Sequence, residues 1–176
     1  MILKKSIFPV VASSILSLCL LAQNVNAGGV PSSASLPLDQ TMFMFTDTGE
    51  IEAKQKLSDY QGDVILVEFW ATHCGYCKDN FPKLSALSER YADQGLKVIA
   101  VSTDSDRDRL VEYIKREAPG VQIAWDLSDL VSSGYNIEHI PHTILLDRSG
   151  NIIHQQIGAF SAADVDVLNQ KIRSAI

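Results

Sequence analysis

The chain has 176 residues, 46% of them hydrophobic, and a formal net charge of −6 at pH 7. An acidic chain without a run of basic residues is a poor candidate for nucleic-acid binding. Once an N-terminal leader is set aside, the remaining length suits one domain with a hydrophobic core and is too short for two.

The leader, residues 1–27, has the layout of a signal peptide. Lys4 and Lys5 precede an almost wholly apolar stretch, Ile7–Ala22, and the small residues of Val25–Ala27 suit a signal peptidase. The apolar stretch is shorter than the roughly 20 residues that span a bilayer. We therefore expect cleavage at the end of this segment and a periplasmic or otherwise exported protein, with an uncleaved N-terminal membrane anchor as the alternative.

Residues 28–36 are small, polar and turn-rich, and we interpret them as a flexible lead-in to a single domain at 37–176. A short strand is expected at Met42–Phe45. After a turn at Asp47–Gly49, residues 50–56 are expected to return as an edge strand.

The strongest strand pattern is Val64–Trp70, which is β-branched and aromatic throughout except for Glu68. Such a run is typical of a strand that is covered on both faces. Apolar residues then recur at intervals of three and four from Cys77 to Tyr91, which predicts one face of a helix. Leu96–Ser102 is a second buried strand pattern.

The second half of the chain alternates between helix and strand patterns. In chain order we expect a helix capped by Ser105, a strand, a helical turn, an antiparallel hairpin and a Ser-capped helix, at Ser105–Gly120, Val121–Trp125, Leu127–Tyr135, His142–Asp147 with Asn151–Ile157, and Ser161–Ala175. This alternation predicts an α/β fold with a mixed central sheet flanked by helices.

The two cysteines that follow the leader, Cys74 and Cys77, are three residues apart at a strand-to-helix junction. At the start of a helix, the unpaired N–H groups and the helix dipole favour a thiolate at Cys74. Cys77 lies about one turn further on, close enough to form a disulfide and more buried. An exposed nucleophile with a buried resolving partner is the arrangement of a thiol-disulfide oxidoreductase.

Three other interpretations of the cysteine pair remain open. A structural disulfide is one, although so short a loop adds little stability. A metal half-site is another, with His139 and His142 as further ligands, although Pro141 lies between them and a second cysteine pair is missing. An inert reduced pair is the third, and it does not suit an oxidising compartment. We expect neither a metal nor a cofactor.

Glu68 is a second candidate because a carboxylate within a buried strand is costly unless it is neutralised or paired. Burial would raise its pKa and let it exchange a proton with Cys77 near neutral pH. The alternatives are an ion pair, for instance with Lys97 on the next strand, or an edge position that faces water.

The sequence ILVEFWATHCGYCKDNFPKL (Ile65–Leu84) resembles thioredoxin-fold proteins, and most closely the exported TlpA/ResA-like thiol-disulfide oxidoreductases. Upstream, FTDTGE and KLSDYQGDVILVEFW resemble the extra N-terminal strands of that family. Downstream, YNIEHIPHTILLDRSGNII resembles its loop, its proline and its final hairpin. The resemblance covers roughly residues 37–175 and implies a thioredoxin fold with an additional N-terminal β-hairpin.

The resemblance also implies roles for matching residues. Cys74 would be the nucleophile and Cys77 the resolving cysteine, joined as a disulfide in the oxidised form. Glu68 would be the buried acid. Pro141 would be a cis-proline facing the disulfide, and Ile140 would offer backbone hydrogen bonds to a bound peptide.

Further candidate substrate contacts are Trp70, Gly75 and Tyr76. Two features depart from the family pattern. His73 stands where a tryptophan is usual and is a candidate for tuning the pKa of the nucleophile, although a solvated histidine is an equal alternative. Gly75-Tyr76 replaces the Gly-Pro of thioredoxin, which leaves the redox direction open.

Taken together, the sequence predicts an exported, monomeric reductase of protein disulfides, for instance those of apocytochrome c or of metal-site cysteines. The resemblance implies electrons from a membrane thiol donor of the DsbD/CcdA type. A disulfide oxidase or isomerase is the alternative enzyme. A copper or zinc carrier, or an apocytochrome-binding module, is the alternative of another class.

Overall fold

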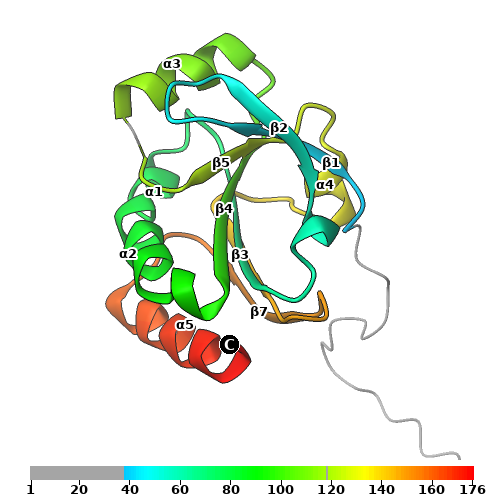
Figure 1. Cartoon of the computed structure of the whole chain (residues 1–176). Helices are drawn as coiled ribbons and strands as arrows, with labels where there is room; N and C mark the ends of the chain where they lie inside the picture. Colours follow the sequence, from blue (N-terminus) through cyan, green and yellow to red (C-terminus); the bar gives the residue numbers. More distant parts are fainter. Residues whose placement is uncertain (1–37, 118) are drawn as a thin grey trace, which may run out of the picture. The chain divides into compact units, whose positions relative to one another are not determined.

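The computed structural model describes residues 38–117 and 119–176. The predicted leader, the lead-in and its possible cleavage site lie outside the described residues. The described part forms one mixed sheet in the order β2-β1-β5-β4-β3-β6-β7, visible in Figure 1. Its strands are β1 Thr41–Phe45, β2 Ile51–Lys56, β3 Val64–Trp70, β4 Leu96–Ser102, β5 Gln122–Trp125, β6 His142–Leu146 and β7 Ile152–Ile157.

Five α-helices and two 3-10 helices connect these strands within the described residues. They are η1 Leu57–Tyr60, α1 Gly75–Lys78, α2 Phe81–Tyr91, η2 Ala92–Gln94, α3 Arg107–Glu117, α4 Leu130–Gly134 and α5 Ala162–Ala175. The predicted mixed sheet, the N-terminal hairpin with β2 as an edge strand, and the C-terminal hairpin are confirmed.

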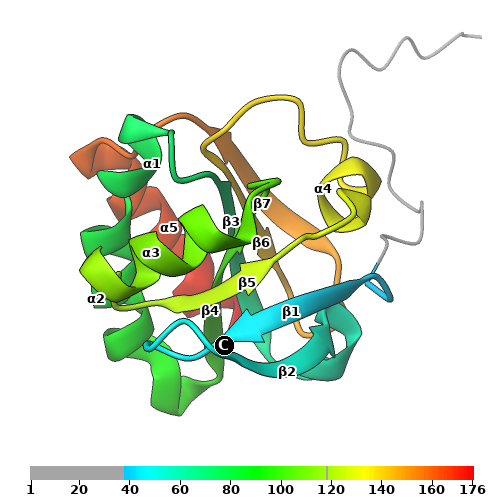
Figure 2. The ribbon, with the colours of Figure 1, turned by 90° about the horizontal axis from the view of Figure 1, so that it is seen from above.

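The helices cover both faces of the sheet unequally, as Figure 2 shows. Side chains alternate between the faces of a strand, so Leu66 and Trp70 on β3 pack with α2, α3 and α5, whereas Val67 and Phe69 pack on the side of α4. Glu68 belongs to the first set and therefore points to the face that α2 covers. This alternation brings a carboxyl group and the helix after the cysteines to the same side.

The strand directions bring several loops to one edge of the sheet. β3, β4 and β5 are parallel neighbours, so their carboxyl ends lie together. β6 is antiparallel to β3, and its first residue, His142, pairs with Phe69 near the end of β3. The cysteine segment and the Pro141 segment therefore meet at this edge, although many residues separate them in the sequence.

The predicted continuous helix after the cysteines is instead two helices, α1 and α2, separated at Asp79 and Asn80. Pro82 is the cause, because its nitrogen cannot donate the helical bond to the carbonyl of Lys78 and its ring restricts Phe81. Asn80, which lies at this interruption, is fully buried.

The predicted capping serine of α3 is also corrected. The carboxylate of Asp106 accepts hydrogen bonds from the backbone N–H groups of Asp108 and Arg109, at 3.0 and 3.2 Å. Asp106, and not Ser105, therefore satisfies the first free amides of this helix. Among the described residues, none of the helices has both the length and the apolar character needed to cross a membrane.

Candidate active site

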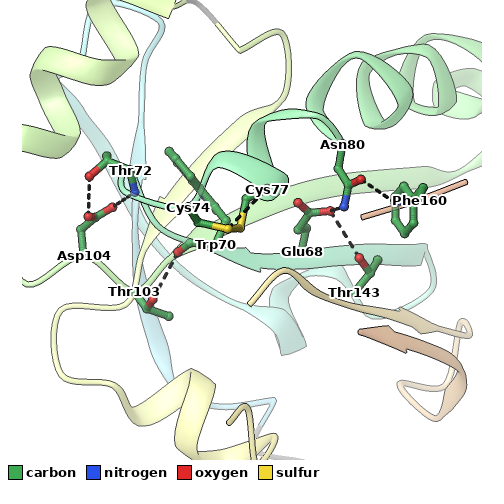
Figure 3. The surroundings of a disulfide bond; sticks show 10 residues. All are labelled: Glu68, Trp70, Thr72, Cys74, Cys77, Asn80, Thr103, Asp104, Thr143 and Phe160. Atoms are coloured by element: carbon green, nitrogen blue, oxygen red, sulfur yellow. Dashed lines mark hydrogen bonds between the residues drawn. A yellow bond between two sulfur atoms is a disulfide. The ribbon is translucent and has the colours of Figure 1, made fainter. Parts of the chain in front are cut away.

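The two cysteines lie directly after β3 and are joined by a disulfide bond (Figure 3). Cys74 is the N-cap of α1 and is partly exposed, whereas Cys77 is fully buried within that helix. The backbone N–H of Cys77 donates to Cys74 Sγ at 3.2 Å. The predicted position of Cys74 at the start of a helix is confirmed, and the difference in burial distinguishes an accessible sulfur from a protected one.

Glu68 is completely buried behind this pair. Its Oε2 accepts hydrogen bonds from Asn80 Nδ2 at 3.1 Å and from Thr143 Oγ1 at 3.3 Å, while its Oε1 has no partner among the described residues. Burial raises the pKa of Glu68 to about 8, although the bonds from Asn80 and Thr143 and the charge of Lys83 oppose the rise. The carboxyl group can therefore gain or lose a proton near neutral pH.

Neither an edge position that faces water nor an ion pair with Lys97 accounts for Glu68. β3 is an interior strand, paired with β4 on one side and β6 on the other, so Glu68 does not face water at an edge. Its neighbour on β4 is Ala100, whereas Lys97 lies opposite Ile65 and is exposed. The hydrogen-bond partners of the carboxyl group are therefore the uncharged side chains of Asn80 and Thr143.

Asn80 is the site residue that sequence reasoning missed. Its Oδ1 accepts a 2.8 Å hydrogen bond from the backbone N–H of Phe160, which directs its amide hydrogens toward Glu68. Lys83 in turn donates to the carbonyl of Phe160 at 2.7 Å. An asparagine just before a Phe-Pro helix start carries no signal of its own, because only the tertiary contact with residue 160 shows its orientation.

The segment at the start of β6 reaches the same edge of the sheet as the cysteines, because His142 pairs with Phe69 near the end of β3. The Ile140–Pro141 peptide bond is cis, and the Pro141 carbonyl accepts a 2.8 Å hydrogen bond from the N–H of Gly158. Ile140 is partly exposed, so its backbone is near the surface. Thr143, two residues after the proline, is the residue that reaches Glu68.

The other predicted contact residues divide into two groups. His73, Gly75 and Tyr76 are exposed around the disulfide, and the side chain of Tyr76 is the most prominent, at 73% exposure. Trp70 is fully buried and packs edge-on against Phe81, with ring centroids 4.9 Å apart. The prediction that Trp70 contacts substrate is wrong, because the period-two pattern of β3 turns its ring into the core.

The histidines considered for a metal half-site lie in different surroundings. His139 is exposed, whereas His142 is buried on the face of the sheet opposite Glu68 and Thr143. No group of three or more metal-ligating side chains occurs in the part of the chain that the structure describes. Trp125 and Tyr135 are both buried in the core.

This arrangement suits thiol-disulfide exchange, in which one thiolate attacks a disulfide and a second thiol releases the product. The accessible sulfur of Cys74 can reach a partner's disulfide. Cys77 lies beneath it, within bonding distance, and Glu68 supplies a group with a pKa near neutrality on the same face of the sheet.

Comparison with known proteins agrees with this chemistry. The Redoxin family model matches residues 30–172. The thiol-disulfide oxidoreductase ResA of Geobacillus kaustophilus is 28% identical over 124 residues, which cover 70% of each chain.

Solved structures show the same fold. A putative thiol:disulfide interchange protein DsbE from Chlorobium tepidum superimposes with a TM-score of 0.67 at 28% identity, covering 76% of this chain and 92% of that one. StoA from Bacillus subtilis shares the fold, with a TM-score of 0.59 at 21% identity over 75% of this chain and 96% of that one. The predicted thioredoxin fold and family resemblance are confirmed, and the chain belongs to the Redoxin family as a thiol-disulfide oxidoreductase of the ResA/DsbE type.

Proposed function

We propose that this protein is an exported reductase of protein disulfides, with Cys74 as nucleophile, Cys77 as resolving cysteine and Glu68 as the group that manages the proton of Cys77. The observation that carries the proposal is the buried Glu68 carboxyl group with its pKa near 8, on the side of the sheet where Cys77 is buried. Export rests on the signal-like sequence of residues 1–27.

The reaction begins with the reduced Cys74/Cys77 pair. The Cys74 thiolate attacks one sulfur of the substrate disulfide, and the other substrate sulfur leaves as a thiolate and takes a proton. The product is a mixed disulfide between Cys74 and the substrate. The N–H of Cys77, directed at Cys74 Sγ, favours the ionised form of the attacking sulfur.

The second step releases the substrate. Cys77 gives its proton to the Glu68 carboxylate, and the resulting thiolate attacks Cys74 Sγ. The second substrate sulfur leaves as a thiolate, and the Cys74–Cys77 disulfide forms. The substrate has then gained two electrons and the enzyme has lost two. A carboxyl group with a pKa about one unit above neutrality is suited to this transfer, because both of its protonation states are populated.

The protein substrate is proposed to bind between the exposed Tyr76 and the Ile140–Pro141 segment, which reach the same edge of the sheet. Apocytochrome c or the cysteines of a metal site are the proposed substrates. Electrons to restore the dithiol would come from a membrane thiol donor of the DsbD/CcdA type, as the resemblance of the sequence to TlpA/ResA-like proteins implies.

Trapping the mixed disulfide tests the cysteine roles. The reduced Cys77→Ser variant should accumulate a mixed disulfide with a protein substrate that contains a disulfide, because the resolving thiol is gone. Dithiothreitol should cleave this complex. The Cys74→Ser variant, in which Cys77 stays buried, should capture at least tenfold less. Equal capture by both variants would contradict the assignment of Cys74 as nucleophile.

The redox potential of the couple tests the direction. A value near that of thioredoxin, about −270 mV, supports a reductase, whereas one near −120 mV supports an oxidase. A wild-type protein that binds zinc or copper tightly but neither reduces nor oxidises a disulfide would instead favour the metal-carrier alternative.

A further inference from the structure

Asp104 is a second buried carboxylate next to the cysteines, and the chemistry described so far does not use it. It follows the end of β4 and is 6% exposed. Its Oδ2 accepts hydrogen bonds from the backbone N–H of Thr72 and from Ser102 Oγ, both at 2.8 Å, and its Oδ1 accepts from Thr72 Oγ1 at 2.7 Å. In Figure 3, this cluster and Glu68 lie on opposite sides of the disulfide.

The residue that Asp104 holds, Thr72, belongs to the turn that leads into Cys74. Thr72 is buried, and the next backbone bond in this turn runs from the N–H of Cys74 to the carbonyl of Ala71, at 3.0 Å. Both the main chain and the side chain of Thr72 are bound to one carboxylate. The position of this turn therefore depends on a residue of the neighbouring strand.

Asp104 is itself fixed from two directions. Trp125 Nε1, on β5, donates to the Asp104 carbonyl at 2.6 Å, and Ser102 Oγ accepts from the Asp104 N–H at 3.1 Å. The adjacent Thr103 N–H donates to the carbonyl of Trp70 at 2.9 Å. These hydrogen bonds thus connect the ends of β3, β4 and β5 at the base of the turn. A reactive group is held precisely only when the residues that support it are themselves fixed.

We propose that Asp104 is a positioning residue that, through Thr72, fixes the turn before Cys74 and so presents the Cys74 sulfur in line with the disulfide of a protein substrate. This inference rests on the proposed role of Cys74 as nucleophile. A displacement of about 1 Å in a reacting group can reduce a rate about 100-fold, so a residue that does not touch the substrate can control the attack.

The direction of the rate change when Asp104 is neutralised distinguishes a positioning role from an electrostatic one. A carboxylate near Cys74 disfavours the thiolate, because like charges repel. If the charge of Asp104 were its main influence, neutralising it would raise the thiolate fraction of Cys74, and with it the rate toward every reagent, wherever Cys74 is only partly ionised, and would not slow either reaction once Cys74 is fully ionised. If Asp104 acts by positioning, the variant should reduce a protein disulfide more slowly than wild type does. Its reaction with a small reagent should not slow, because a small reagent needs no defined direction of approach.

Asp104→Asn is the direct test because the amide preserves the shape but weakens the bonds to Thr72. Asp126→Asn is the matched control. Asp126 is also buried, follows the end of the next strand, and accepts from the N–H and Oγ of Ser132, at 2.8 and 2.9 Å, at the start of α4. The two variants remove the same chemistry, but only the first removes it beside the cysteines.

Two rates are compared with reduced enzyme, above the pH at which Cys74 ionises. We expect reduction of insulin by Asp104→Asn to fall about tenfold or more, the effect of losing a hydrogen bond to a charged group. Alkylation of Cys74 by iodoacetamide should stay within twofold. Asp126→Asn should lose comparable stability to urea and keep both rates.

Insulin reduction by Asp104→Asn within twofold of wild type, or an equal loss in Asp126→Asn, would overturn the positioning role while leaving the proposed function intact. Failure of the wild-type protein itself to reduce insulin would overturn both.

If Asp104→Asn does not fold, Thr72→Val and Thr72→Ser test the positioning role instead. Valine should slow insulin reduction several-fold, serine should restore it, and equal rates for the two would contradict the proposal.

Discussion

The Asn80 side chain donates a 3.1 Å hydrogen bond to Glu68 Oε2, while its own oxygen is held by the N–H of Phe160 at 2.8 Å. This one amide therefore connects the buried acid to the loop before α5. It also limits the rise in the Glu68 pKa that burial causes. A neutral residue thus keeps the carboxyl group within the range where a proton can move.

Replacing Asn80 with alanine should destabilise the fold and raise the Glu68 pKa further. The N–H of Phe160 would be left without its acceptor, and an unsatisfied buried polar group costs about 1–3 kcal/mol. Urea unfolding gives the free energy, and an NMR titration of the Glu68 carboxyl carbon gives the pKa. Asn169→Ala is the control: Asn169 accepts from Tyr91 Oη at 2.9 Å away from the cysteines, so its loss should lower stability without changing that titration.

The stability of the oxidised protein should fall as the pH rises from 4.5 toward 8. The folded state raises the pKa of Glu68 from 4.5 to about 8, so it favours the neutral acid. This contribution is complete below 4.5 and is lost as the pH rises through the folded pKa. Glu68→Gln has no such proton, so its stability relative to wild type should increase over this window, by at most about 5 kcal/mol. A pH-independent difference between the two proteins would contradict the raised pKa.

Glu68→Gln should also slow the release of substrate from the mixed disulfide. Glutamine cannot accept the proton of Cys77, and a positioned acid-base group contributes about 100-fold or more. Rapid-mixing experiments that follow formation and decay of the mixed disulfide separate the two steps. Formation, which depends on Cys74, should change little. A variant with unchanged decay would leave Glu68 with a structural role only.

Much of the fold was predictable because its signals are local. The continuous apolar run of β3 required cover on both faces, and the spacing of Cys74 and Cys77 located the reactive pair. Pro82 was visible too, but the periodicity of apolar residues continued through it and hid the break between α1 and α2. Helical spacing reports which face is buried and does not report a missing backbone hydrogen bond.

The surroundings of the cysteines were less predictable because their contacts are distant in sequence. Asn80 and Asp104 are polar residues of ordinary appearance, and only their hydrogen bonds with Phe160 and Thr72 show which segments they hold. Trp70 was misassigned for a related reason. An aromatic residue next to a reactive motif is compatible with both a binding surface and the core, and the strand's alternation decides between them.

Tyr76 and Trp70 should respond oppositely to substitution. Tyr76 lies between the cysteines with 73% of its side chain exposed, so Tyr76→Ser should raise the KM for a protein disulfide several-fold and leave stability within about 0.5 kcal/mol. Trp70→Phe should lower the free energy of unfolding by about 2 kcal/mol, because it leaves a cavity beside Phe81, and should leave KM unchanged. Steady-state kinetics and urea unfolding on the same samples make the comparison. An altered KM in Trp70→Phe alone would reverse this assignment.

His142 should lower the stability of the folded protein as the pH falls, whereas Glu68 lowers it as the pH rises. Burial, with a smaller contribution from the charge of His139, lowers the pKa of His142 below its usual 6.5, although a side-chain hydrogen bond with Gln155 opposes the shift. The folded state therefore favours the neutral ring, and this contribution is present above 6.5 and lost as the pH falls through the lowered folded pKa. The stability of His142→Leu relative to wild type should therefore increase as the pH falls from 7 to 5. Parallel curves for wild type and His142→Leu would mean that the pKa of His142 is the same in the folded and unfolded states, which would contradict the lowered pKa.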